Sequence, residues 1–167
     1  MYTASKAALA TLVLALLAAG SVRAQGVNGS ISATATVQSP ITVTGVQNLA
    51  FGNVFPGAAK TVAYSDATNA GRFDVTGQGS APVTYSFALP TNLTSGGNNL
   101  PIGSWTGYLN TSNSTSGGSA ITPSATPASA TLSAGGALYV FVGATVTPPS
   151  NLPAGSYTGT VTLTVSY

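Results

Sequence analysis

The stretch YTGTVTLTVSY at residues 157–167 alternates strictly between two kinds of side chain. One set of alternate positions carries Tyr157, Gly159, Val161, Leu163, Val165 and Tyr167, and the other carries only threonine and serine. Successive side chains of a β-strand point to opposite faces, so this period predicts a strand with one buried and one polar face. We expect the strand to pair within its own sandwich, with Val161, Leu163 and Val165 directed inward.

Similar short alternating runs fill the chain after residue 24, and turn-forming residues separate them. Glu, Lys and Arg, which favour exposed helices, are almost missing there, and no stretch has helical periodicity. The runs predicted to be strands are 29–37, 40–46, 60–64, 71–77, 81–89, 101–109, 128–134, 137–146 and the terminal stretch. The pattern predicts an all-β fold, an antiparallel immunoglobulin-like β-sandwich of about eight or nine short strands without a helix after residue 24.

The run ALYVFVGATV at residues 137–146 is apolar on both faces, which is typical of a central strand. One face carries Leu138, Val140 and Val142, and the other carries Tyr139 and Phe141. Segments 91–99 and 110–127 are rich in Ser, Thr, Asn and Gly. We expect both of them to be long polar loops on the surface.

Residues 1–24 have the pattern of a secretory signal peptide. Lys6 precedes a short apolar run, and small residues lead to an expected cleavage after Ala24. The run is short for a bilayer span and no stop-transfer pattern follows it, so we expect no membrane span after cleavage. Cleavage leaves 167 − 24 = 143 residues, which suits one sandwich domain at 25–167. We expect a secreted protein, extracellular or at the cell surface, which passes through the periplasm if the host is Gram-negative.

Charged side chains are almost absent from the expected mature chain. Two of the four basic residues leave with the signal peptide, so Lys60 and Arg72 remain against Asp66 and Asp74 and the formal net charge is 2 − 2 = 0. A chain with two cationic side chains has no basic patch, which argues against nucleic acid as a partner. A net charge near zero favours association with other protein surfaces.

The side-chain inventory also excludes most catalytic chemistry. The chain has no His and no Cys, and its two acidic residues are Asp66 and Asp74, so Glu is absent as well. The commonest general base, a thiolate nucleophile and most zinc sites therefore cannot form. Asp74 lies two positions from Arg72, where an ion pair is the expected outcome. We expect a protein that is not an enzyme and that has no catalytic residues, metal site or cofactor.

The stretch SWTGY at residues 104–108 holds the only Trp of the chain. Trp105 and Tyr108 would form a sugar-stacking platform if both rings were exposed. On a strand, however, these two positions point to opposite faces, so core packing is the favoured reading of at least one ring. A secreted carbohydrate-binding module is the alternative function that this stretch leaves open.

Three pieces of the sequence together resemble a known bacterial family. They are LAFGNVFPG at 49–57, FDVTGQG at 73–79 and LPAGSYTGTVTLTVSY at 152–167. Their order is similar to that in the secreted domains called domain of unknown function 4402 and, more distantly, in archaic chaperone–usher pilins and spore-coat-U-like proteins. The positions interpreted as fold-determining are Phe51, Gly52, Gly57, Phe73, Gly77, Gly155, Tyr157, Val161, Leu163, Val165 and Tyr167. A glycine with positive φ suits the turn around Pro56, and Tyr157 resembles a tyrosine corner.

The pilin resemblance implies a subunit that lacks one strand and receives it from the N-terminal extension of a neighbour. The candidate donor is NGSISATATVQ at residues 28–38, with Ile31, Ala33, Ala35 and Val37 on one face. An ordinary edge strand is the other reading of residues 25–39. The expected function is a structural or adhesive surface protein, with a fimbrial subunit as the specific case. The expected partners are copies of the chain or other surface subunits, joined by strand addition, and a periplasmic chaperone.

Overall fold

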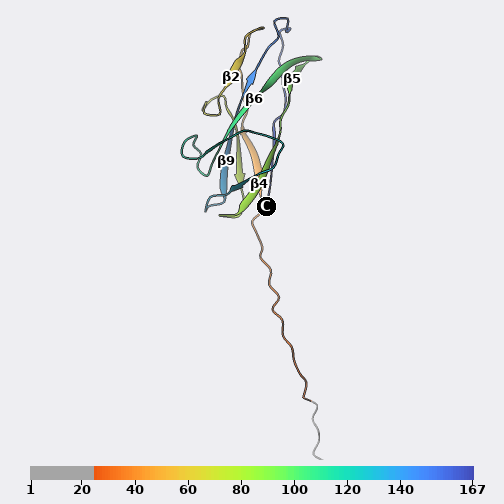
Figure 1. The fold of residues 1–167 in the computed structure, drawn as a ribbon, viewed down its shortest axis with the longest axis vertical. Helices are drawn as coiled ribbons and strands as arrows, with labels where there is room; N and C mark the ends of the chain where they lie inside the picture. The colour runs from red at the N-terminus through yellow and green to blue at the C-terminus, as the bar shows by residue number, and fades with distance from the viewer. Residues whose placement is uncertain (1–24) are drawn as a thin grey trace, which may run out of the picture. The chain divides into compact units, whose positions relative to one another are not determined.

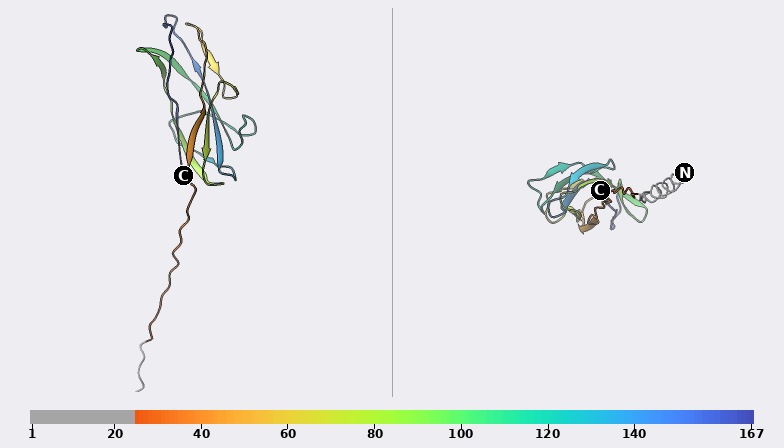
Figure 2. Two further views of the ribbon diagram at one scale, coloured as in Figure 1. Left: turned by 180° about the vertical axis from the view of Figure 1, so that it is seen from behind. Right: turned by 90° about the horizontal axis from the view of Figure 1, so that it is seen from below.

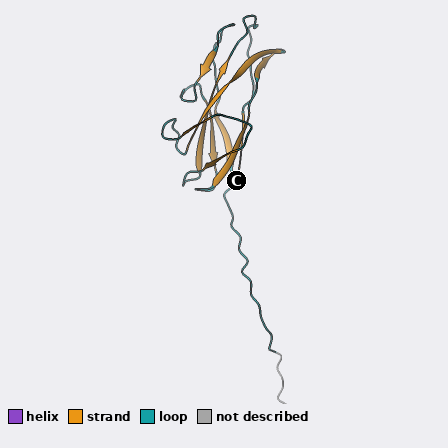
Figure 3. Cartoon of the chain, viewed as in Figure 1, coloured by secondary structure: helices purple, strands orange, loops and turns teal. Residues whose placement is uncertain are grey.

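The computed structural model describes residues 25–167, and the expected signal peptide lies outside them. Contacts divide the chain into a unit that ends at Thr36 and a unit from Val37 to Tyr167. The second unit contains ten strands and no helix is found in residues 25–167 (Figure 3). The strands are β1 (Thr42–Gln47), β2 (Lys60–Val62), β3 (Gly71–Thr76), β4 (Pro82–Ala88), β5 (Asn92–Ser95), β6 (Asn98–Asn110), β7 (Ser119–Ile121), β8 (Ala128–Thr131), β9 (Ala137–Val146) and β10 (Thr162–Ser166).

The strands form two antiparallel sheets, which confirms the predicted all-β class and is consistent with a sandwich. The larger sheet has the order β1-β3-β9-β6-β5, with β2 paired to β9 and β7 paired to β6. The smaller sheet has the order β10-β4-β8. The long strands β6 and β9 run side by side through the larger sheet (Figure 1).

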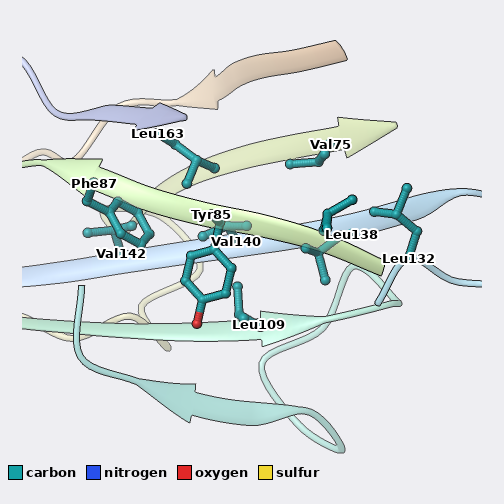
Figure 4. Close-up of a cluster of buried hydrophobic side chains, with 10 residues drawn as sticks. Val75, Tyr85, Phe87, Leu109, Leu132, Leu138, Val140, Val142 and Leu163 are labelled. Atoms are coloured by element: carbon teal, nitrogen blue, oxygen red, sulfur yellow. The ribbon is translucent and has the colours of Figure 1, made fainter. Parts of the chain in front are cut away.

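The core lies between the inner faces of the two sheets. In Figure 4, Tyr85 and Phe87 of β4 point toward Val140 and Val142 of β9, and Leu163 of β10 packs beside them. Val140 is fully buried, which confirms β9 as the central strand. Burial also raises the pKa of the Tyr85 hydroxyl. The terminal strand pairs with β4 inside its own sandwich, as expected.

A second core cluster fills the opposite end of the sandwich. Its buried members are Phe51, Val62, Leu100, Ile102, Ala144 and Val146. Leu49, Val54, Leu93 and Tyr157 are partly buried against it. Several of these side chains also line the groove of the candidate site, so this cluster lies directly beneath that groove.

The outer face of β9 is covered by the connection between β2 and β3. A Cβ added at Gly143 would lie 2.4 Å from the Val62 carbonyl oxygen and 2.5 Å from the Tyr64 backbone nitrogen. Gly143 therefore permits a close backbone crossing that no larger residue fits. The Tyr64 ring continues this cover by stacking on Tyr108 of β6, with ring centroids 5.2 Å apart.

The structure corrects the expectation for residues 29–37, which form no strand. A lone extended segment has unpaired N–H and C=O groups unless a sheet edge pairs with them, and no strand in residues 25–167 does so. The edge-strand reading of residues 25–39 is therefore wrong for the chain by itself. The terminal strand also begins at Thr162 rather than at Tyr157.

Two short strands lie in the segments that were expected to be polar loops. Residues 92–95 form β5, and Ser119–Ile121 form β7. A tight turn joins β5 to β6 through Gly96 and Gly97, whose φ angles of 53° and 85° suit the two-residue hairpin turn that favours glycine. The Gly-Gly pair between Leu93 and Leu100 was the signal that predicts this hairpin.

Candidate functional site

Strands β1 and β10 are edge strands of different sheets, and they approach each other without pairing. Neither strand contains a charged residue or a proline, which are the usual devices that protect an open edge. Strands β7 and β8, in contrast, are only three and four residues long. The open edges of β1 and β10 therefore have the features of surfaces that accept another strand.

A groove of about 710 Å³ lies along the continuations of these two edges. Residues 47–54, which follow from β1, form one side, and residues 155–159 with Val161, which lead into β10, form the other. The lining also includes Pro90, Gly71, and the apolar side chains of Phe73, Leu93, Leu100, Ile102 and Val142. No charged residue lines it. We call this hollow the edge groove.

The first side of the edge groove ends in a rigid turn at residues 52–58. Gly52 and Gly57 have φ angles of 59° and 77°, a conformation that glycine adopts without strain. The Gly57 N–H donates to the Pro148 carbonyl at 2.9 Å, and Lys60 Nζ donates to the Asn53 carbonyl at 3.1 Å. These bonds hold the turn, although the Phe55 side chain at its tip is 72% exposed.

The second side of the edge groove is held by a tyrosine corner and by β5. The Tyr157 hydroxyl donates to the Pro153 carbonyl at 2.8 Å, which fixes the bend before the terminal strand. Thr158 and Thr94 exchange two backbone hydrogen bonds, at 2.8 and 3.1 Å. One edge of this segment is thus paired with β5, and its other edge faces the groove.

Removal of the Tyr157 hydroxyl tests this corner. We expect Tyr157→Phe to lower the free energy of unfolding by about 1 kcal/mol, because one hydrogen bond is lost and the ring remains. Urea unfolding measures the difference. Tyr139→Phe is the matched control, because the structure gives the Tyr139 hydroxyl no hydrogen bond within residues 25–167. Equal effects of the two substitutions would contradict the role of the corner.

The space between the two edges is closed at the far end by Tyr167. Its hydroxyl donates to the Ser39 carbonyl at 2.5 Å and accepts from the Gln78 N–H at 2.6 Å. A Cβ at Gly77 would lie 2.7 Å from the same hydroxyl oxygen, so the absence of a side chain there allows the contact. Figure 2 shows the C-terminus beside the residues that lead into β1.

The residues predicted to donate a strand lie in an exposed, unpaired segment. Ile31 is 97% exposed and Val37 is 94% exposed. Ala33 and Ala35 are exposed as well, and residues 25–40 contain no charged side chain. Exposed apolar side chains in an unpaired segment are typical of a surface that binds a partner.

A smaller polar cleft of about 240 Å³ contains Asp66 and Arg72. Hydrogen bonds from the Asn69 side chain and from the backbone of Asn69 and Thr68 lower the pKa of Asp66. Arg72 Nε bonds to Asp74 at 2.9 Å, as the sequence predicts for this pair. The two carboxylates are thus engaged in local bonds, and residues 25–167 contain no group of acidic or metal-ligating side chains that could hold a metal ion.

Trp105 and Tyr108 do not form a shared exposed platform. Trp105 is partly buried and packs against both core clusters. Tyr108 is buried on the other face, beneath Tyr64, and its hydroxyl accepts a hydrogen bond from the Gly118 N–H at 2.7 Å. The rings therefore present no common flat surface to a sugar.

The fold and the edge groove define a class of protein: an antiparallel β-sandwich with two open edges beside an uncharged groove that has several apolar side chains in its lining. The chain belongs to the family described as Domain of unknown function (DUF4402), whose model matches residues 15–167. No curated protein matches the chain. Within residues 25–167, no helix is long and apolar enough to cross a membrane.

Proposed function

We propose that the protein is a secreted, non-enzymatic structural subunit of the cell surface that assembles by strand donation. Residues 28–38 of one copy enter the edge groove of the next copy. The inserted segment pairs its backbone with the open edges and buries Ile31, Ala33, Ala35 and Val37 against the groove lining. A periplasmic chaperone is the partner expected to protect the groove before assembly.

The match between the edge groove and the exposed segment carries this proposal. The groove is lined by apolar and uncharged polar side chains, and the continuations of two edge strands, β1 and β10, form its sides. Residues 28–38 are uncharged, exposed and apolar at alternate positions. A strand placed there would satisfy backbone groups on both sides and cover the second core cluster, which is the physical basis of strand addition.

Backbone hydrogen bonds are expected to contribute as much to the binding free energy of the inserted segment as its side chains do. Full burial of Ile31 or Val37 contributes about 1.5–3 kcal/mol each, whereas the two alanines contribute much less. Backbone hydrogen bonds to one or both edges supply the rest, at about 1 kcal/mol each. The inserted strand is thus a moderate ligand whose binding depends on the regular pairing of its whole length.

Size-exclusion chromatography with light scattering tests the proposal on two chains. One begins at Gln25, and the other begins at Ser39, so that Tyr167 keeps its acceptor. We expect the longer chain to form polymers and the shorter one to remain monomeric and to unfold at lower urea concentration. A peptide of residues 25–38 should restore the stability of the shorter chain, because it fills the groove.

A scrambled peptide of the same composition is the control, since it keeps the hydrophobicity and removes the alternation. Two monomers of equal stability, neither of which responds to the peptide, would refute strand donation.

A further inference from the structure

The inference drawn here deepens the proposed function and rests on it: it concerns where the incoming copy touches the acceptor outside the edge groove. The direction of the inserted strand decides this. The groove runs along residues 47–54 and 155–161. Beyond it the gap continues between β1 and β10, and the hydrogen bonds among Tyr167, Ser39 and Gln78 close the far end of that gap. The opposite end of the groove, which we call the mouth, is the end lined by Val54 and Gly155.

The donor segment has one free end and one end that is joined to a whole sandwich. Residues 25–28 are at the free end, and residue 39 is where its own sandwich begins. Only the free end fits at the closed end, because the incoming sandwich would collide there with the Tyr167 contacts. The segment therefore points its free end toward Tyr167, and its residues 38–40 leave the groove at the mouth.

This direction also sets which donor residues lie in the groove. At about 3.3 Å per residue, a strand laid beside residues 155–161 carries the same number of residues, from Ile31 to Val37. The next residues, Gln38 to Pro40, then emerge at the mouth. Pro40 has a fixed φ and no N–H, so it ends the pairing and presents a rigid apolar ring.

Phe55 is the side chain that stands at the mouth. It directly follows Val54, the last groove residue on its side, and it is 72% exposed. Its turn is fixed by the bond from the Gly57 N–H to the Pro148 carbonyl and by the 3.1 Å bond from the Ala58 N–H to the Phe55 carbonyl. An aromatic ring that a rigid backbone holds in solvent is typical of a residue that anchors an interface.

We propose that Phe55 of the acceptor packs against Pro40 of the incoming copy. The contact extends the interface beyond the groove and sets the angle at which successive copies follow one another. Proline rings commonly pack against aromatic side chains in protein interfaces. Both groups are rigid, so they lose little conformational entropy on binding.

A double-mutant cycle tests the contact. The acceptor is the chain from Gln25 with Ala33→Asp and Ala35→Asp, two exposed changes that prevent it from donating its own segment. It is prepared with Phe55 and with Phe55→Ala. The labelled peptide spans residues 25–41, with Pro40 or with Pro40→Ala. Fluorescence anisotropy gives the four dissociation constants.

We expect Pro40→Ala to weaken binding about fivefold to the acceptor with Phe55, and to have no such effect on the acceptor with Phe55→Ala. Tyr139→Phe, a change outside the groove lining and outside both open edges, is the control acceptor and should keep the full fivefold difference. Equal effects of Pro40→Ala on both acceptors would overturn the contact while strand donation stands. Failure of every peptide to bind any acceptor would refute the proposed function, and the contact with it.

Discussion

Aspartate at positions 33 and 35 should abolish assembly of the chain that begins at Gln25. Both alanines lie on the face of residues 28–38 that the proposal places against the apolar lining of the edge groove. Burial of two unpaired carboxylates costs several kcal/mol each, which corresponds to a loss of more than about a hundredfold in affinity. Light scattering should find a monomer at concentrations where the unchanged chain forms polymers.

The control for this prediction uses the opposite face of the same segment. Ser32→Asp with Thr34→Asp adds the same two charges one residue away, where the side chains of an inserted strand would point to solvent. This variant should still assemble. Loss of assembly in both variants would mean that charge alone prevents association, and retention in both would mean that residues 33 and 35 are not buried.

Alanine at position 143 should destabilise the sandwich by about 3 kcal/mol, at the upper end of the range for overpacked sites. The added Cβ would lie 2.4 Å from the Val62 carbonyl oxygen and 2.7 Å from the Ala63 carbonyl carbon. Both neighbours are backbone atoms, so β9 or the β2–β3 connection has to shift. That shift would also disturb the stacking of Tyr64 on Tyr108.

Urea unfolding of Gly143→Ala against Gly103→Ala measures this effect. Gly103 lies on the neighbouring strand β6, and a Cβ placed there meets no atom within 4 Å. Its replacement should change the free energy of unfolding by less than about 1 kcal/mol. If both variants unfolded at the same urea concentration, the close crossing over β9 would not be a structural constraint.

The sequence correctly predicted the strands in which each face keeps the same character, apolar or polar, along the whole strand. The run at 137–146 is apolar on both faces and is the central strand, and the run at 81–89 is confirmed by β4. The hairpin of β5 and β6 was not predicted, because Leu93 is the only apolar residue of β5 and gives no alternating pattern. Its pairing depends on two glycines in a positive-φ turn rather than on alternation.

Residues 29–37 were predicted to be a strand, and the structure has none there. Their alternation is as regular as that of β10, yet only β10 has an edge to pair with, and alternation does not reveal whether such an edge exists. The edge groove could not be located from the sequence either, because residues 47–54 and 155–161 meet only after both sheets have folded. Phe51, Gly52, Gly155 and Tyr157, which were interpreted from the sequence as fold-determining, are among the residues that line it.

Neither the edge groove nor residues 25–40 contain a charged side chain. This affects how the proposed joint between copies responds to salt and pH. Ions in the medium weaken attraction between charged groups, and acidity changes the charge of carboxylates and amines. A joint between copies that uses only backbone hydrogen bonds and apolar contacts contains neither kind of group. Neither salt screening nor mild acidity would therefore weaken a fibre made of such joints.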